Sequence, residues 1–318
     1  MSGAGGSETP SVEERLAWEA QFGSRAAIAA ILAGIATIAG TVLGGVALRD
    51  RPSVTIPQGL RDALDPTSPH GLLEKTVRFV NDHVTVLTIG QAMTALSAPL
   101  TALALVYLFR ATRARRPEFG QGALIALAAG GVATFIGILV GQISVDVAVS
   151  NFLDPGHAHG TKAAHDALQP SLALTSGLIG FVGHVALGLG IVLIALNAMR
   201  VGLLTRFMGV LGIMAGVFLA FPFFSIPIVQ AFWLIGLGML FFGRFPNGAP
   251  PAWETGRAEP WPTRQEMLEA QQRAKGQGDG APPRETGRTP KDLPPPAPVD
   301  PGAERPQHSR SKKKKRRR

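Results

Sequence analysis

The chain has 318 residues, of which 46% are hydrophobic, and its mean hydropathy of +0.20 is too high for an ordinary soluble domain. Lys and Arg number 31 against 22 Asp and Glu, but eight of the 31 lie in residues 310–318, so the high isoelectric point describes a tail rather than a basic domain. There are no cysteines, which excludes disulfides, thiol nucleophiles and cysteine-bound metal clusters.

Residues 1–25 are interpreted as a cytoplasmic segment that contains a short helix at 11–22. Ser11 and Glu14 have the spacing of a capping box, and Gly23 is expected to end the helix. Trp18 and Phe22 lie one turn apart, so this helix is expected to rest on the membrane surface. A cleaved signal peptide is the competing interpretation, but the apolar segment that follows is unusually long for one.

The apolar blocks predict an all-α fold, a polytopic transmembrane helical bundle, because about 20 apolar residues cross a membrane. Leu73, Val77 and Val80 share one face of an interfacial helix that precedes the second span. The last two spans are short and are separated by Pro222 and Pro227, so a re-entrant hairpin is the alternative there. Six spans are expected, at residues 26–48, 84–109, 121–145, 172–199, 207–222 and 227–243.

The connecting segments predict the orientation. For their length, segments 1–25, 110–120 and 200–206 carry more Lys and Arg than segments 49–83, 146–171 and 222–227. Because basic residues in short loops favour the cytoplasm, both chain ends are expected there.

Residues 244–318 have a different composition, with 14 of the 25 prolines and few large apolar residues. We expect them to form a disordered, Pro-rich cytoplasmic tail. Its polybasic end is a candidate for contact with anionic lipid or with nucleic-acid phosphates, although simple reinforcement of the topology is an equal explanation. The basic residues are Arg310, Lys312, Lys313, Lys314, Lys315, Arg316, Arg317 and Arg318.

Small residues recur every four positions on the third and fourth spans, which predicts that these two helices are close neighbours. Tight packing without any further purpose is the favoured interpretation of the two stripes. They are Ala129, Ala133, Gly137 and Gly141 on the third span, and Ser176, Gly180, His184 and Gly188 on the fourth.

No Asp, Glu, Lys or Arg lies deep inside any expected span, which argues against a proton pump or an aspartate-based intramembrane protease. His184 falls near the middle of the fourth span, either as a proton-responsive group or as a hydrogen-bonding bridge between helices, the latter being favoured. The second span has a polar face formed by Gln91, Thr94 and Thr101, bordered by Ser97.

These residues suggest a polar cavity that opens to the outside, with ordinary interhelical hydrogen bonding as the alternative that is favoured. Its expected members are Gln91, Gln142, His184 and Gln230, with Asp146 at the mouth.

The third connecting loop, residues 146–171, contains His157, His159 and His165, which are suitable ligand types for zinc or copper. Their spacing is not that of a known compact site. Metal binding and pH sensing are therefore less favoured than the interpretation of these residues as solvated. No Gly-rich phosphate loop, His-Glu-x-x-His helix or nucleophile elbow occurs, and the sequence identifies no cofactor, substrate or oligomeric state.

Three stretches carry a resemblance: Arg206-Phe-Met-Gly-Val-Leu-Gly-Ile-Met-Ala-Gly216, Pro227-Ile-Val-Gln-Ala-Phe-Trp233-Leu234 and Pro251-Ala-Trp-Glu-Thr-Gly256. Together, over residues 200–262, they resemble uncharacterised multi-pass membrane proteins of actinobacterial type, a family of unknown function. The resemblance implies a bacterial inner (cytoplasmic) membrane location and supplies no catalytic or binding residues.

The sequence favours a non-enzymatic integral membrane protein that engages lipid or protein partners. A small-solute transporter or channel that uses the polar cluster is the alternative, and a membrane enzyme with metal at the histidine loop ranks third.

Overall fold

The computed structural model describes residues 11–53, 55, 57–58, 72–156, 160–221, 227–246, 248–262, 266 and 268–269. The chain divides into two compact units, Met1–Trp261 and Pro262–Arg318, and only four residues of the second are described. The regular elements of the described part are helices: α1 (Val12–Ala47), α3 (Leu72–Asp82), α4 (Val84–Arg115), α5 (Gly122–Leu153), α6 (Thr161–Leu168), α7 (Ser171–Arg200), α8 (Arg206–Ala220), α9 (Pro227–Phe241) and α10 (Pro251–Thr255).

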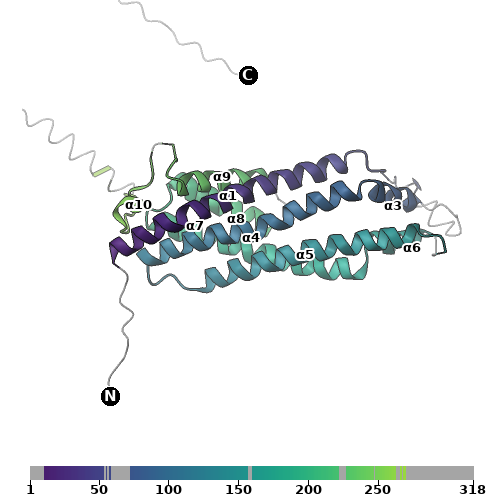
Figure 1. The fold of residues 1–318 in the computed structure, drawn as a ribbon, viewed down its shortest axis with the longest axis horizontal. Coiled ribbons are helices and arrows are strands. Elements are labelled where there is room, and N and C mark those ends of the chain that lie inside the picture. Colours follow the sequence, from purple (N-terminus) through teal and green to yellow (C-terminus); the bar gives the residue numbers. More distant parts are fainter. Residues whose placement is uncertain are drawn as a thin grey trace, which may run out of the picture. The chain divides into compact units, whose positions relative to one another are not determined.

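Six apolar helices form a closed ring in the order α1, α4, α5, α7, α8, α9, in which each helix contacts the next and α9 contacts α1. The contact between α5 and α7 is the most extensive, and α4 also touches α7 across the ring. Figure 1 shows the helices running side by side, with α10 at one end of the bundle and α3 and α6 at the other. The first and last apolar helices of the sequence are therefore neighbours.

Four helices are long and apolar enough to cross a membrane: α1, α4, α5 and the one that contains α7. α8 and α9 are apolar but shorter, with 15 residues each. The bundle exposes large aliphatic side chains, an arrangement that soluble monomers rarely show over so wide an area. The structure is thus an all-helical bundle that is compatible with a membrane, as expected, whereas six crossings stay a prediction. The exposed side chains include Ile28, Leu32, Ile35, Leu103, Ile125, Val132, Leu178, Val182 and Leu189.

The capping box at the start of α1 is confirmed: Ser11 Oγ accepts a hydrogen bond from the Glu14 amide at 3.2 Å, and the Glu14 carboxylate accepts from the Ser11 amide at 2.8 Å. The predicted stop at Gly23 is wrong, because α1 continues for 36 residues. A Cβ at Gly23 would lie 3.3 Å from the Tyr107 hydroxyl, so this glycine allows two helices to approach. Trp18 stacks on Tyr107, with ring centroids 5.3 Å apart, which places this part of α1 against α4.

The predicted closeness of the third and fourth spans is confirmed by the contact between α5 and α7. A Cβ at Gly137 would lie 2.5 Å from the Gly180 Cα, and one at Gly130 would lie 2.4 Å from the Leu187 amide nitrogen. The buried stripe of α5 contains Gly130 and Gly137, whereas Ala129 is exposed. An α-helix has 3.6 residues per turn, so residues spaced strictly by four drift gradually away from one face. The residues of α5 that face α7 are therefore spaced by steps of three and four.

α8 and α9 pack against each other and, with 15 residues each, are the two shortest helices of the ring. The Trp233 indole Nε1 of α9 donates to the Met208 carbonyl of α8 at 3.0 Å, and the Trp233 side chain is fully buried. A Cβ at Gly188, near the middle of α7, would lie 2.9 Å from Ala220, the last residue of α8. α8 therefore ends near the middle of α7, not at the far end of that helix.

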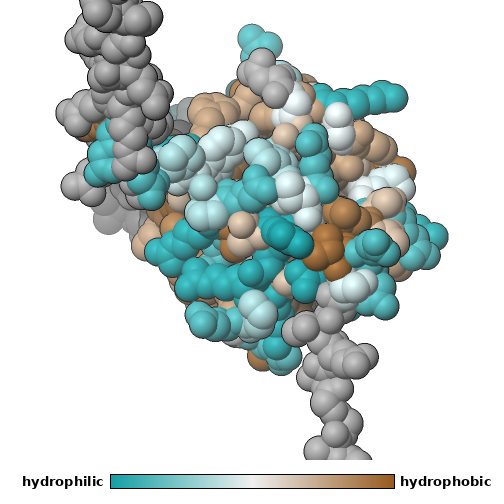
Figure 2. Space-filling view, turned by 90° about the vertical axis from the view of Figure 1, so that its left-hand side faces the viewer, coloured by the Kyte–Doolittle hydropathy of each residue, from teal (hydrophilic) through white to brown (hydrophobic). Residues whose placement is uncertain are grey.

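The segment after α9 folds back onto the end of the bundle, so the predicted tail boundary at residue 244 is too early: the compact unit continues to Trp261. The indoles of Trp253 and Trp261 donate to the carbonyls of Leu203 and Leu204, both at 2.9 Å. These carbonyls belong to the turn after α7, where helix geometry leaves acceptors without partners. The boundary was predicted too early because the high proline content of residues 244–318 was taken as typical of a disordered segment over its whole length. Figure 2 looks onto this end, where hydrophilic residues are gathered among scattered hydrophobic ones.

The opposite end carries a smaller apolar cluster, in which Val77 of α3 packs with Val149 and Phe152 of α5 and with Ala164 and Ala167 of α6. The helix predicted from Leu73, Val77 and Val80 is thus present as α3, and its apolar face covers the ends of other helices.

Candidate functional site

A polar cavity of about 110 Å³ lies inside the ring, beside the turn of the α8–α9 hairpin. Every helix of the ring contributes to its wall, so it is a feature of the whole bundle and not of one helix pair. Its polar lining residues are Thr37 and Thr41 of α1, Thr94 and Ser97 of α4, Thr134 of α5, His184 of α7 and Gln230 of α9; Ala98, Leu187, Leu219 and Pro227 complete it.

Four hydroxyls of the cavity give their protons to their own helices. Thr37 and Thr41 donate to the carbonyls of Ala33 and Thr37, at 2.9 Å and 2.8 Å. On α4, Thr94 and Ser97 donate to the carbonyls of Gly90 and Thr94, at 3.0 Å and 2.7 Å. A hydroxyl whose proton is used in this way keeps only its lone pairs for other partners. These four side chains therefore offer hydrogen-bond acceptors.

Thr134 is different, because its hydroxyl oxygen is buried and has no hydrogen-bond partner among the described residues. The residue is 2% exposed, and a Cβ at Gly183 of α7 would lie 2.7 Å from this oxygen. The glycine thus leaves room for the hydroxyl at the helix contact. Thr134 lines the cavity, but its hydroxyl oxygen is covered at the contact with α7, so this oxygen adds nothing to the hydrogen-bonding surface inside the cavity.

His184 and Gln230 supply the remaining polar groups. The Gly180 carbonyl accepts a hydrogen bond from His184 Nδ1 at 2.8 Å, so Nδ1 carries a proton. In a neutral imidazole, Nε2 is then an acceptor. The Gln230 amide has both donors and an acceptor. No Asp, Glu, Lys or Arg is among the described lining residues.

The cavity is consequently uncharged and richer in acceptors than in donors. Since a water molecule occupies about 30 Å³ of liquid volume, there is room for roughly three waters or a solute of a few heavy atoms. Thr41 is exposed, so the polar lining continues to the surface on the α1 side. A small molecule with several N–H or O–H donors matches this lining.

The five residues predicted to share a cavity are divided by the structure. His184 of α7 and Gln230 of α9 both line the cavity described above. Gln142 donates to Asp146 at 2.8 Å, and Asp146 also accepts from Thr88 at 2.7 Å, which forms a separate link between α4 and α5. Gln91 is exposed and does not line the cavity.

Sequence reasoning did not single out Thr37, Thr41 or Thr134. Thr37 and Thr41 are one turn apart and stand beside Gly40, which contacts Thr94 of α4. Two hydroxyl residues beside a glycine that allows close helix packing could have predicted that Thr37 and Thr41 face α4. Thr134 was hidden because the predicted stripe passed through Ala133, one position away.

The other predicted sites are not assembled by the described residues. His165 is exposed on α6, and His157 and His159 lie outside the described residues, as does the polybasic run 310–318. Within the described ranges, no group of three His, Asp or Glu side chains is placed to hold a metal ion.

No protein-family model, curated protein or solved structure matches the chain. The resemblance to actinobacterial multi-pass membrane proteins therefore stays a prediction.

Proposed function

We propose that the protein is an integral protein of the bacterial cytoplasmic membrane in which α1, α4, α5 and α7 cross the bilayer. At 1.5 Å per residue, α8 and α9 are each about 22 Å long, shorter than the ~30 Å hydrocarbon layer. The hairpin interpretation fits their turn near the middle of α7 better than two complete spans do. Either topology leaves both ends of the described bundle on one side, which the basic loops favour as the cytoplasmic side.

Within that membrane setting, the protein binds a small, uncharged, hydrogen-bond-donating solute and allows it to permeate. One observation carries this function: a closed ring of apolar helices encloses a cavity that is lined by the polar side chains of Thr, Ser, His and Gln residues. Polar groups inside a membrane bundle lower its stability unless they have hydrogen-bond partners. A bundle that only contacted lipid or protein partners on its surface would therefore be more stable with an apolar interior.

Reconstituted liposomes test the function. The purified full chain is inserted into liposomes, and the permeability to water and to urea is measured by stopped-flow light scattering. Urea carries several N–H donors and one acceptor, so it complements the lining. We expect higher urea permeability than in protein-free liposomes, and a loss of that increase in Gln230→Leu.

Thr175→Val is the matched control, because Thr175 is an exposed residue of α7 whose hydroxyl also bonds its own helix, with the Ser171 carbonyl at 3.0 Å. It should behave as the unmodified chain does. Thr134→Val removes a buried hydroxyl that has no hydrogen-bond partner among the described residues, so the thermal stability of this variant should not fall. A permeability equal to that of empty liposomes for both probes would sink the proposal.

A further inference from the structure

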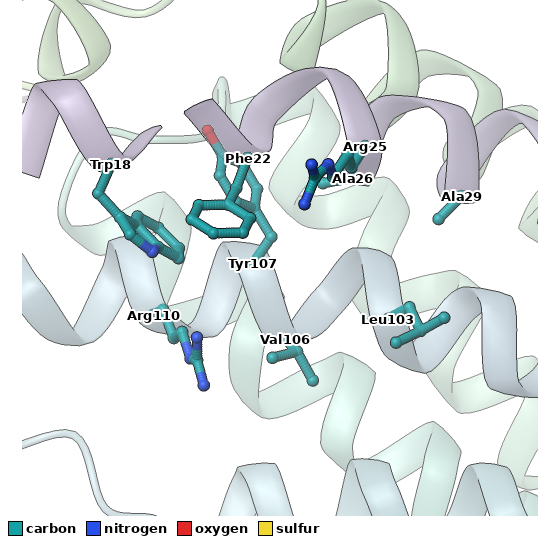
Figure 3. A pocket seen from close by; sticks show the side chains of 9 residues that line it. All are labelled: Trp18, Phe22, Arg25, Ala26, Ala29, Leu103, Val106, Tyr107 and Arg110. Atoms are coloured by element: carbon teal, nitrogen blue, oxygen red, sulfur yellow. The ribbon is translucent and has the colours of Figure 1, made fainter. Parts of the chain in front are cut away.

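A second hollow lies on the outer surface of the ring, in the groove between α1 and α4 at the end where α10 lies. Its volume is about 230 Å³, and it is separate from the central cavity. Figure 3 shows the rings of Trp18, Phe22 and Tyr107 gathered at one end of the groove, with Leu103 toward the other. The hollow thus has an aromatic end and an aliphatic end.

Two arginines border the aromatic end, Arg25 from α1 and Arg110 from α4 (Figure 3). Both are exposed, and neither forms an ion pair with a described carboxylate. The Arg25 guanidinium lies 5.6 Å from the centroid of the Phe22 ring. Two guanidinium groups that are free of carboxylates favour an anion, and phosphate matches their planar arrays of donors.

The acidic groups near the groove are already engaged. Glu14 and Glu19 line its continuation beside Trp18 and Arg110. Glu19 forms an ion pair with Arg115, and Glu14 accepts a hydrogen bond from the Ser11 amide. Glu14 keeps its negative charge, but it does not line the hollow itself, whose only charged lining residues among those described are Arg25 and Arg110, so the charge beside these two arginines is positive.

The aliphatic end is formed by Ala26 and Ala29 of α1 and by Leu103 and Val106 of α4, with Leu103 61% exposed. The alanines leave the groove hollow, because they do not fill the space beside Leu103. Seven residues separate Leu103 from Arg110, which corresponds to about 10 Å along the helix. The predicted spans begin at residue 26 and end at residue 109, so both arginines fall at the level of lipid headgroups, with the aliphatic end inside the hydrocarbon.

We propose that this groove binds an anionic phospholipid, with its phosphate between Arg25 and Arg110 and part of one acyl chain against Ala26, Ala29, Leu103 and Val106. The proposal rests on the membrane insertion proposed above, but not on solute permeation. Charge and apolarity are adjacent in one groove, which suits an amphipathic ligand rather than free phosphate.

Native mass spectrometry of the full chain tests the proposal, with phosphatidylglycerol and phosphatidylcholine as probes. We expect phosphatidylglycerol to be retained preferentially, and its occupancy to fall by about tenfold in Arg25→Gln/Arg110→Gln, as the loss of charge-assisted hydrogen bonds implies. Arg257→Gln, an exposed arginine that does not line the groove, is the control for general charge and should retain the lipid. Any contribution from residues 310–318 is the same in all variants.

A second variant tests the acyl-chain contact. Ala29→Phe fills the aliphatic end without changing charge, and it should also reduce retention. The proposal is overturned if the double arginine variant keeps the lipid, if phosphatidylcholine is retained equally, or if glycerol 3-phosphate alone displaces phosphatidylglycerol. A dimer that disappears on lipid addition would instead assign the groove to a second copy of the chain. Resistance to alkaline carbonate extraction, measured in parallel, separates a failure of the lipid site from a failure of membrane insertion.

Discussion

Glu19 and Arg115 form an ion pair at the end of the bundle where α1 begins and α4 ends. Both side chains are almost completely buried, and Arg115 also donates to the Ala252 carbonyl of α10 at 2.6 Å. The Arg115 guanidinium lies 5.6 Å from the centroid of the Trp253 ring. One arginine thus joins three helices. Such a pair contributes little net stability compared with apolar residues, but the loss of one partner leaves a buried charge.

Glu19→Ala should therefore destabilise the bundle by about 3–5 kcal/mol, because Arg115 would remain buried without its carboxylate. The free energy of unfolding is measured by denaturant titration in detergent. Glu19→Leu/Arg115→Met should recover much of the loss, although the Ala252 carbonyl would still lack its donor. Glu118→Ala, at an exposed position, should change little. Equal stability of Glu19→Ala and Glu118→Ala would show that the ion pair is not buried as described.

At the scale of elements, the ring depends on glycines that allow backbones to meet. At Gly137, the three nearest atoms to an added Cβ are all backbone atoms of α7, between 2.5 and 2.7 Å away. Backbone atoms cannot move aside as a side chain can, so the two helices would have to separate. The polar cavity lies beside this contact, because Thr134 and His184 are each within one turn of it.

Gly137→Ala should cost about 1–3 kcal/mol of stability through overpacking. Gly177→Ala is the matched control on α7, because nothing lies within 4 Å of a Cβ at that position. It should be neutral or stabilising, since alanine favours a helix over glycine by up to about 1 kcal/mol. Thermal unfolding of the two variants in the same detergent gives the comparison. A smaller loss at position 137 than at 177 would contradict the described crossing.

The element scale also shows what the sequence could predict. Apolar length located α4, α5, α7, α8 and α9 to within a few residues at most ends, because hydrophobic blocks are local in sequence. The stop at Gly23 was not predicted correctly, since a glycine that ends a helix and one that admits Tyr107 look alike without the partner. His184 and Gln230 were both predicted to line one cavity, because each is a polar residue inside an apolar span. Thr134 was not predicted, because its position in the helix contact is visible only once Gly183 of α7 is placed beside it. Such pairings depend on helix rotation, which a four-residue pattern defines poorly.

At the scale of the whole molecule, Ser11 and Thr255 lie at the same end of the bundle, because α10 packs against α1. Gln169 lies at the opposite end, in the short connection between α6 and α7. The chain has no cysteines, so single cysteine variants report sidedness without background. This property makes the proposed topology directly measurable.

We expect Ser11→Cys and Thr255→Cys to be shielded from a membrane-impermeant maleimide in spheroplasts and labelled after permeabilisation, whereas Gln169→Cys is labelled in both cases. Phe221→Cys, next to the turn of the hairpin, should resist labelling from either side. Labelling of position 221 from outside would establish two complete spans in place of the hairpin. Opposite sidedness for positions 11 and 255 would refute the bundle topology.

Closure of the ring has a consequence for biosynthesis. α9 is synthesised after the other five helices of the ring, and it lies between α8 and α1. Until residue 241 has been translated, the ring of helices is not closed, and the cavity lacks the lining residues Gln230 and Pro227. The indoles that bond the turn after α7 are synthesised later still. The wall of the polar cavity is therefore completed only after α9 has been synthesised.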